Sequence, residues 1–221
     1  MKLFADTANL VEINDLIEKG IIDGVTTNPS LMAKEPKTDF FNHIKNIADI
    51  CRESDGLPLS VEVFATSPEE MIKQAIEIRD ETDYDFLNIK IPIGYEELRV
   101  IKTLSDQGID VNCTCCFTSG QLQLAARAGA RYVSLFYNRL IDAKGDPNLV
   151  LQQTRKFIDE NSLDCEIICG SIRKPEDVSN AWDSGSHIVT AGHRVIKEMT
   201  EHYKTDESIA GFLSDFKEWL R

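Results

Sequence analysis

The stretch Ala126-Arg-Ala-Gly-Ala-Arg-Tyr-Val-Ser-Leu-Phe136 contains the unit from which the whole chain is built. A helical segment ends at Gly129, and an apolar run begins at Tyr132. Glycine is common just past a helix end because it adopts the left-handed backbone conformation without steric cost. The stretch therefore predicts a helix that is followed directly by a short buried strand.

The same succession of helix, glycine and apolar run recurs elsewhere in the chain. Three further glycines stand before apolar runs in this way, namely Gly20, Gly108 and Gly185. Eight apolar runs have the length of a strand, near residues 3–6, 24–28, 59–64, 86–92, 111–116, 132–136, 166–170 and 187–190. Strands that alternate with helices of about 10–15 residues indicate parallel βα units.

Eight alternating units favour an α/β fold, a single (β/α)8 TIM barrel that occupies residues 1–221. Barrels of this kind commonly have about 200–250 residues in one domain. The alternative is a doubly wound open sheet with fewer strands. Two helix starts fit the alternation, because Ser67-Pro-Glu-Glu70 and Lys174-Pro-Glu-Asp177 each place proline at the first helical position.

Residues 208–221 are predicted to form an additional amphipathic helix at the C-terminus. Its apolar side chains recur at helical spacing, at Ile209, Phe212, Leu213, Phe216, Trp219 and Leu220. The eight βα units are complete before this helix begins, so it is surplus to the barrel. It either covers the bottom of the barrel or packs on a neighbouring subunit, and the pattern favours neither.

The composition excludes several classes of protein. With 37 acidic and 24 basic residues, the formal net charge is −13, and such a surface repels nucleic acids. No apolar stretch reaches the roughly 18 residues that cross a bilayer, so no membrane partner is expected. The N-terminal residues lack the pattern of a signal peptide. The six cysteines are expected to be buried reduced thiols, which predicts a cytoplasmic protein.

Reactive side chains gather where the predicted strands end. A barrel has its active site at the C-terminal ends of its strands. One candidate lies at or near the end of each of the first seven strands: Asp6, Asn28, Glu62, Lys90, Thr114, Ser134 and Ser171. Their convergence is a stronger indication of an active site than any one of them.

Lys90 is the most informative of these residues, because it interrupts the apolar run Phe86-Leu-Asn-Ile-Lys-Ile-Pro-Ile93. Alternation along the strand places Asn88 and Lys90 on one face and the apolar residues on the other. The apolar face packs on helices, so Lys90 is predicted to point into the barrel. Burial disfavours an ammonium group, and a neutral amine attacks a carbonyl carbon. The alternative is a lysine at the strand end that reaches solvent or pairs with an acid.

Two carboxylates interrupt or end apolar runs in the same way. Glu62 is a candidate general acid or base, acting directly or through water; alternatively, it only holds Lys90 in an ion pair. Asp6 ends the first strand and is a candidate for moving the proton of a sugar hydroxyl. A helix cap is the alternative role of Asp6.

Two arginines that could bind an anionic substrate come directly after the predicted sixth and seventh strands. Arg139 and Arg173 come directly after these strands, and Ser171 adds a hydroxyl group. A phosphate fits this combination at the barrel end where phosphate sites are frequent, whereas ordinary surface arginines are the alternative. The four histidines form no metal-binding pattern, and glycine-rich nucleotide motifs are absent. We therefore expect neither a metal ion nor a nucleotide cofactor.

From residue 1 to about residue 199, the chain resembles the short transaldolases, a family that includes fructose-6-phosphate aldolase-like proteins. The resemblance rests on the motifs Phe4-Ala-Asp-Thr-Ala-Asn9, Asp23-Gly-Val-Thr-Thr-Asn-Pro-Ser30, Asn88-Ile-Lys-Ile-Pro92, Asn112-Cys-Thr114, Ser134-Leu-Phe-Tyr-Asn-Arg139 and Ser171-Ile-Arg173. The second and third motifs together are highly specific for this family.

The resemblance implies a transaldolase of the pentose phosphate pathway. Such an enzyme moves a dihydroxyacetone unit from fructose 6-phosphate or sedoheptulose 7-phosphate to an aldose phosphate. Lys90 would form a Schiff base with the ketose carbonyl, and Asp6 would move the proton of the hydroxyl at the broken bond. Glu62 and Thr114 would position a water molecule that shuttles protons.

The resemblance also implies how substrates and subunits are held. Asn28 and Ser134 would hydrogen-bond the dihydroxyacetone unit, while Arg139, Ser171 and Arg173 would bind the phosphate. The short members form rings, so a homo-oligomer of five or ten chains is implied. In these rings the C-terminal helix packs on a neighbour.

Two positions bear on the choice between transfer and plain cleavage. The aldolase branch of the family carries Gln at the position of Glu62 and Tyr at that of Phe136, a pocket position. Phe136 donates no proton to the carbanionic intermediate, which then waits for an acceptor aldehyde. An aldolase that releases free dihydroxyacetone and a non-catalytic sugar-phosphate binder are the alternatives. Leu135, where the family usually has Pro, and the sulfur-rich run 113–116 depart from the family pattern.

Overall fold

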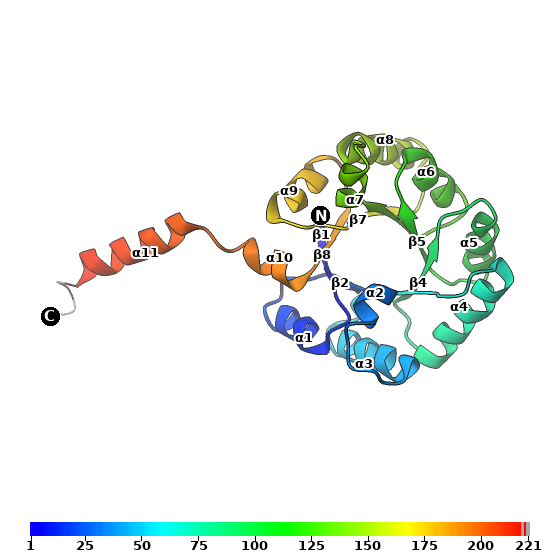
Figure 1. Ribbon diagram of the computed structural model, residues 1–221, viewed down its shortest axis with the longest axis horizontal. Helices are drawn as coiled ribbons and strands as arrows, with labels where there is room; N and C mark the ends of the chain where they lie inside the picture. The colour runs from blue at the N-terminus through cyan, green and yellow to red at the C-terminus, as the bar shows by residue number, and fades with distance from the viewer. Residues whose placement is uncertain (218, 220–221) are drawn as a thin grey trace.

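The computed structural model describes residues 1–217 and 219, and its centre is a closed barrel of eight parallel strands (Figure 1). The strands follow one another around the barrel in chain order, and β8 pairs with β1 to close it. Their bounds are β1 (Lys2–Asp6), β2 (Gly24–Thr26), β3 (Leu59–Glu62), β4 (Leu87–Pro92), β5 (Val111–Cys116), β6 (Tyr132–Phe136), β7 (Glu166–Gly170) and β8 (Ile188–Ala191). The prediction of a (β/α)8 barrel is confirmed.

Helices connect the strands and form a ring around the barrel (Figure 1). The longer connections are α1 (Leu10–Glu18), α3 (Phe40–Glu53), α4 (Pro68–Thr82), α5 (Glu97–Asp106), α6 (Ser119–Arg127), α8 (Pro147–Glu160) and α9 (Pro175–Asp183). Three short helices follow strands directly, namely α2 (Pro29–Met32), α7 (Tyr137–Asp142) and α10 (His193–Glu198). The last helix is α11 (Tyr203–Phe216).

The glycines that mark helix ends in the sequence have the backbone conformation that this role requires. The φ angles are 64° at Gly20, 73° at Gly108, 101° at Gly129 and 103° at Gly185. Side chains other than glycine adopt these left-handed angles only at a cost. The four glycines therefore let the chain turn from a helix directly into the next strand.

The two proline-containing helix starts are also found where the sequence places them. The Ser67 hydroxyl accepts a hydrogen bond from the backbone N–H of Glu70 at the start of α4. At the start of α9, the Asp177 carboxylate accepts the backbone N–H groups of Arg173 and Lys174, both at 3.2 Å. These carboxylate bonds fix the loop that leads out of β7.

Alternation along the strands separates two packing layers. Outward-facing side chains such as Val25, Ile89 and Val133 are fully buried against the helices in the main core. Inside the barrel, the lower layer is a small apolar cluster of Phe4, Tyr132, Ile168 and Ile188. Two residues further along the same strands, the inward positions carry Asp6, Ser134, Gly170 and Thr190. The barrel interior therefore changes from apolar to polar toward the strand ends.

Two strands end earlier than the apolar runs suggest. β2 ends at Thr26 rather than at residue 28, and β3 ends at Glu62 rather than at residue 64. Asn28 instead caps α2, because its side-chain oxygen accepts the backbone N–H of Leu31 at 3.1 Å. The start of α2 thus competes with β2 for residues 27–28.

The C-terminal helix α11 leaves the barrel instead of covering its bottom (Figure 1). It begins at Tyr203, five residues before the predicted start at residue 208. The predicted apolar residue Leu220 lies outside the described residues. All residues from Glu201 to Lys217 are exposed, so the apolar face of α11 contacts no core of its own chain.

Within the described residues, no helix combines the length and the apolar character that crossing a membrane requires. All six cysteines are free thiols, and five of them are buried. The exception is Cys115, which is partly exposed.

Candidate active site

A cavity of about 210 Å³ lies at the C-terminal ends of the strands. Nine of the ten residues expected to form the site line it: Asp6, Asn28, Glu62, Lys90, Thr114, Ser134, Phe136, Arg139 and Ser171. The barrel thus brings side chains from β1 to β7, far apart in the sequence, to one place.

Lys90 lies at the centre of this cavity and is nearly inaccessible, since its side chain is 7% exposed. Its Nζ is 3.0 Å from a carboxylate oxygen of Glu62 and donates to the backbone oxygen of Thr27 at 2.7 Å. Glu62 and Lys90 are direct partners in the pairing of β3 with β4. Because parallel partners point to the same side, the register itself holds the amine against the carboxylate.

Asp6 is the second acid of the cavity. Burial raises the pKa of Asp6, and the attraction of the Lys90 ammonium offsets this only in part. The Thr26 hydroxyl donates to the Asp6 carboxylate at 2.9 Å. A carboxyl group with a raised pKa holds a proton more firmly than an exposed one, which suits a group that takes and returns a proton.

Hydroxyl and amide groups fill the remaining interior of the barrel. The Ser134 hydroxyl donates to the side-chain oxygen of Asn112 at 2.6 Å, and the Asn112 amide donates to the Ser60 hydroxyl at 3.2 Å. Asn112 pairs with Lys90 between β4 and β5. The buried Thr114 hydroxyl has no hydrogen-bond partner within the described part of the chain. It is therefore available to a substrate or to water.

An aromatic wall borders the cavity where β6 turns into α7. The Arg139 guanidinium lies 4.7 Å from the centre of the Phe136 ring. Phe117 packs edge to face on the same ring at 5.8 Å. These contacts hold Phe136 in place and keep Arg139 beside the cavity.

Hydrogen bonds from the Asn138 side chain fix the turn after β7. The Asn138 side chain donates to the backbone oxygen of Ser171 at 3.0 Å and to the Asp177 carboxylate at 2.7 Å. Ser171 itself has a φ of 59°, which is unusual for a residue other than glycine. The surrounding hydrogen bonds maintain this conformation and direct Ser171 toward the cavity.

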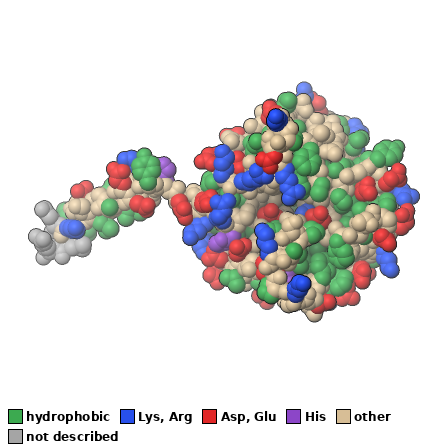
Figure 2. Space-filling view, in the orientation of Figure 1, with side chains coloured by type: hydrophobic (Ala, Val, Ile, Leu, Met, Phe, Trp, Pro, Cys, Tyr) green, Lys and Arg blue, Asp and Glu red, His purple; other side chains and the backbone are tan. Residues whose placement is uncertain are grey.

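Arg173 is the one expected site residue that does not line the cavity. Its guanidinium binds the Asp142 carboxylate through two hydrogen bonds of 3.0 and 2.5 Å. Asp142 is the last residue of α7, so this ion pair joins α7 to the loop after β7. Figure 2 shows Lys and Arg side chains near the middle of the molecular face and acidic side chains scattered around its rim.

The cavity also contains residues that sequence reasoning did not select. They are Thr26, Pro29, Ser30, Asn112, Cys115, Ile168, Gly170 and Thr190. The alternation of side chains along each strand predicts that Thr26, Asn112 and Thr190 point into the barrel. Each lies two residues from another inward-facing residue of its strand. The Cys115 backbone is left-handed, with a φ of 61°, where the β5–β6 pairing is irregular. This bulge turns Cys115 toward the cavity.

The departures from the family pattern differ in their position relative to the cavity. Leu135 is fully buried in the main core and faces the helices. Cys115 lines the cavity, and burial raises the pKa of its thiol. Only the sulfur-rich run therefore changes the cavity surface.

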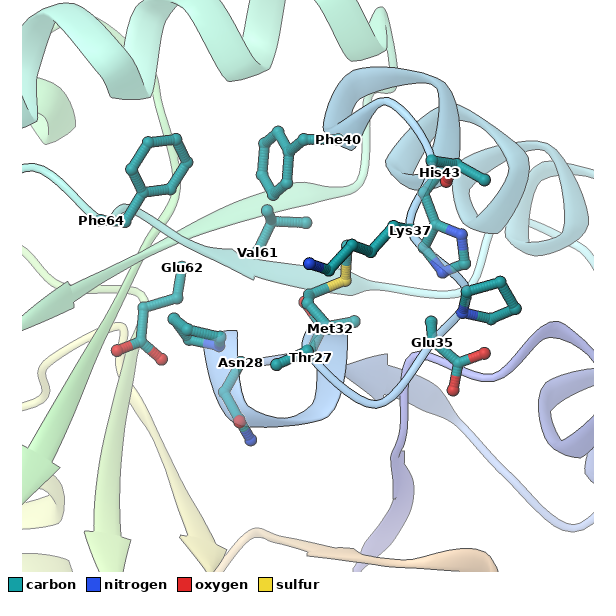
Figure 3. A pocket seen from close by; sticks show the side chains of 14 residues that line it. Thr27, Asn28, Met32, Glu35, Lys37, Phe40, His43, Val61, Glu62 and Phe64 are labelled. Carbon is teal, nitrogen blue, oxygen red and sulfur yellow. The ribbon is translucent and has the colours of Figure 1, made fainter.

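A second cavity of about 470 Å³ lies beside the first, among α2, the loop that follows it, α3 and β3 (Figure 3). Its walls include Met32, Phe40 and Phe64, and it shares Glu62 and Asn28 with the barrel cavity. In Figure 3 the Glu62 carboxylate points away from Lys37 and His43. The reactive groups accordingly face the barrel cavity rather than this apolar one.

The fold and the site together define a (β/α)8 barrel with a cavity at the strand ends that is lined by a buried lysine and by acidic and hydroxyl side chains. A family model described as Transaldolase/Fructose-6-phosphate aldolase matches residues 3–220. The chain belongs to this family.

Curated relatives are similar over nearly their whole length. A probable transaldolase of Clostridium acetobutylicum is 43% identical over 218 residues, which cover 99% of this chain and 98% of the relative. A probable transaldolase of Desulfosudis oleivorans is 42% identical, with 98% of each chain covered. One from Thermoplasma acidophilum is 41% identical, covering 98% of this chain and 96% of the relative.

Proposed function

We propose that this protein is a transaldolase that carries a dihydroxyacetone unit on Lys90. The donor is a ketose phosphate, fructose 6-phosphate or sedoheptulose 7-phosphate, and the acceptor is an aldose phosphate. The observation that carries the proposal is the buried Lys90 amine, held 3.0 Å from Glu62 inside a polar cavity. A protein that only binds a sugar phosphate has no use for such a pair.

Imine formation is the first chemical step. Glu62 takes a proton from the Lys90 ammonium, and the free amine attacks the ketose carbonyl carbon. Glu62 then returns its proton to the hydroxyl group of the carbinolamine, which leaves as water, and a protonated imine remains. The unpaired hydroxyl of Thr114 is suited to hold that water near Glu62.

Cleavage of the carbon–carbon bond is the second step. Asp6 removes the proton of the sugar hydroxyl, and that oxygen becomes the carbonyl of the departing aldose phosphate. The electron pair of the broken bond moves to the imine nitrogen and leaves an enamine on Lys90. The enamine carbon attacks the acceptor carbonyl, and Asp6 returns its proton to the new hydroxyl. The imine nitrogen is the electron sink, so this sequence uses neither a metal ion nor an organic cofactor.

Substrate binding follows from the positions around Lys90. Asn28 and Ser134 are placed to bind the dihydroxyacetone unit, and Arg139 with Ser171 to bind the phosphate. Arg173 can bind a phosphate only after its guanidinium releases the Asp142 carboxylate. Phosphorylated sugars and six free thiols fit a reducing cytoplasm and the pentose phosphate pathway.

The decisive experiment follows glyceraldehyde 3-phosphate after addition of fructose 6-phosphate, with and without erythrose 4-phosphate. We expect product beyond one equivalent per active site only when the acceptor is present, because Phe136 donates no proton to the enamine. Equal product without the acceptor would make the protein an aldolase that releases dihydroxyacetone. Two absences together would contradict both functions: no glyceraldehyde 3-phosphate under either condition, and no erythrose 4-phosphate when sedoheptulose 7-phosphate is the donor and glyceraldehyde 3-phosphate the acceptor.

Removal of the Arg139 guanidinium tests the phosphate site. In Arg139→Ala we expect the KM for fructose 6-phosphate to rise about 10–100-fold, the effect of one charge-assisted hydrogen bond. The KM for unphosphorylated fructose should not change. Arg127→Ala is the matched control, because the Arg127 guanidinium binds Asn161 outside the cavity. An unchanged KM for the phosphorylated sugar in Arg139→Ala would place the phosphate elsewhere.

We further propose that the protein is a homo-oligomer, a pentamer or decamer, in which α11 packs on a neighbouring copy. The side chains of Ile209, Phe212, Leu213 and Phe216 are between 51% and 72% exposed. An apolar helix face of this kind is stable in water only when another surface covers it.

Light scattering on two variants tests this assembly. Phe212→Asp should lower the measured mass to that of smaller assemblies, whereas Ser214→Asp, on the polar face of α11, should leave it unchanged. A wild-type protein that is monomeric at micromolar concentration would contradict the proposal.

A further inference from the structure

A chain of two hydroxyl groups leads from β8 to the carboxylate of Asp6. The Thr26 hydroxyl donates to Asp6 at 2.9 Å, and the Thr190 hydroxyl lies 2.6 Å from the Thr26 hydroxyl. Thr26 and Thr190 are 2% and 5% exposed, so bulk water does not replace these bonds. The three side chains come from β1, β2 and β8, which are neighbours in the barrel.

The number of protons fixes the direction of this chain. The Thr26 hydroxyl has a single proton, and an ionised Asp6 takes it in a hydrogen bond. Thr190 must then be the donor in the contact with Thr26. When Asp6 is protonated, both bonds are able to reverse, because the carboxyl O–H can donate to Thr26 and Thr26 can then donate to Thr190. The hydroxyl groups of Thr26 and Thr190 can therefore form this chain with Asp6 whether Asp6 is ionised or protonated.

Each bond in such a chain polarises the next. A hydroxyl that accepts one hydrogen bond becomes a better donor in a second one, most strongly where the local dielectric constant is low. Thr190 therefore strengthens the bond from Thr26 to the Asp6 carboxylate without touching Asp6 itself.

The charged groups that act on Asp6 come from other parts of the barrel mouth. Lys90 on β4 and Lys34 after α2 favour the ionised carboxylate, whereas Glu62 on β3 disfavours it. From its neighbouring strands, Asp6 receives the hydrogen bond of the Thr26 hydroxyl on β2, and the Thr190 hydroxyl on β8 is linked to Asp6 through Thr26. Burial raises the pKa of Asp6 in spite of the lysines, and the hydrogen bond from the Thr26 hydroxyl opposes this rise.

We propose that Thr190 is a positioning residue that acts through Thr26 to orient Asp6 and to stabilise its ionised form during cleavage of the carbon–carbon bond. The inference rests on the proposed function, since it concerns the step in which Asp6 accepts the hydroxyl proton. It adds a residue on β8, the one strand for which the sequence offered no candidate.

A purely structural role for Thr190 makes different predictions. The Thr190 methyl group contributes to packing, because a Cβ atom added at Gly170 would lie 3.4 Å from it. Thr190→Val keeps a methyl group and the side-chain volume but removes the hydroxyl. Valine is a favoured residue in β-strands. Thr190→Ser keeps the hydroxyl and removes the methyl group. The pair of variants separates hydrogen bonding from packing.

The test compares Thr190→Val, Thr190→Ser, Thr26→Val and the double variant Thr26→Val/Thr190→Val. We expect kcat of Thr190→Val to fall about 10-fold, roughly the effect of one hydrogen bond in a buried chain. The acidic limb of its kcat–pH profile should move to higher pH by up to about one unit. Thr190→Ser should restore both quantities. The double variant should be no slower than Thr26→Val, because Thr190 acts only through Thr26.

Borohydride trapping of the Lys90 imine with fructose 6-phosphate separates this inference from the proposed function. We expect Thr190→Val to trap the imine as wild type does, since Lys90 and Glu62 are untouched. Wild-type kcat and pH profile in Thr190→Val would overturn the role of Thr190, as would a Thr190→Ser variant as slow as Thr190→Val. Additive losses in the double variant would overturn the route through Thr26. A wild-type protein that traps no imine would instead overturn the function on which the inference rests.

Discussion

Lys90→Met should lower kcat/KM for dihydroxyacetone transfer by at least about 10⁴-fold, a loss typical of removing a nucleophile that acts as part of a catalytic unit. Methionine matches the length of lysine but has no amine to attack a carbonyl group. The remaining cavity still binds the sugar phosphate, so substrate affinity should change much less than turnover.

The barrel of Lys90→Met should stay folded. The Lys90 side chain is not part of the apolar core, and the flexible methionine side chain adapts to irregular spaces. The variant leaves the Glu62 carboxylate, which is 15% exposed, without its ion partner. Loss of one partner of a nearly buried pair is destabilising, so we expect a lower melting temperature together with an unchanged circular dichroism spectrum at 25 °C.

Two measurements with one control decide the role of Lys90. After borohydride reduction with fructose 6-phosphate, mass spectrometry should find the added mass in wild type on the peptide that contains Lys90. The control Lys45→Met removes an outer lysine that pairs with Glu81 and should behave as wild type. Turnover by Lys90→Met within about 100-fold of wild type, or a modified peptide elsewhere, would exclude Lys90 as the Schiff-base residue.

The centre of the site was predictable because it depends on alternation and parallel register. Asn88 and Lys90 break an apolar strand with a period of two, and this period alone fixes the face on which Lys90 lies. Glu62 breaks the preceding strand in the same manner, and adjacent parallel strands bring equivalent positions together. The buried pair at 3.0 Å is the direct result.

Other parts of the site depend on contacts that no local pattern contains. Thr26 and Thr190 meet at 2.6 Å although 164 residues separate them, since the barrel closes through β1. Alternation along the strands places both threonines on the inner face of the barrel, but it does not reveal that their hydroxyl groups meet. Arg173 was expected at the phosphate, but the conformation of its loop lets the guanidinium pair with Asp142. The direction of α11 is equally non-local, because no other part of the described chain covers its apolar face.

The second large effect is expected at Asp6, where Asp6→Asn should lower kcat about 10²–10⁴-fold, the usual contribution of a general acid or base. Asparagine preserves the shape of the side chain and can still accept the hydrogen bond from Thr26, but it takes no proton from the sugar hydroxyl. Imine formation precedes this proton transfer. Borohydride should therefore trap as much or more substrate on Asp6→Asn as on wild type, while release of the aldose phosphate becomes slow.

The same substitution should stabilise the protein at neutral pH, because burial raises the pKa of Asp6 above that of the unfolded chain. Between the unfolded and folded pKa values the folded state binds more protons, so the wild-type free energy of unfolding falls as the pH rises through this window. Above the folded pKa the full cost of the buried charge remains. Asp6→Asn avoids that cost, so its advantage in melting temperature should be largest at neutral pH and disappear toward the unfolded pKa near 3.8.

Activity and stability thus move in opposite directions at one position, which a merely structural aspartate would not produce. Ser214→Asp on α11 is a suitable control, since it changes charge far from the cavity and should alter neither quantity. Fast turnover by Asp6→Asn would show that a group other than Asp6 moves the proton, and Glu62 would be the next candidate. A slow variant that also failed to trap the imine would show that Asp6 acts before cleavage. Slow turnover, a trapped imine and a higher melting temperature at neutral pH would together place the buried charge of Asp6 at the step in which the carbon–carbon bond breaks.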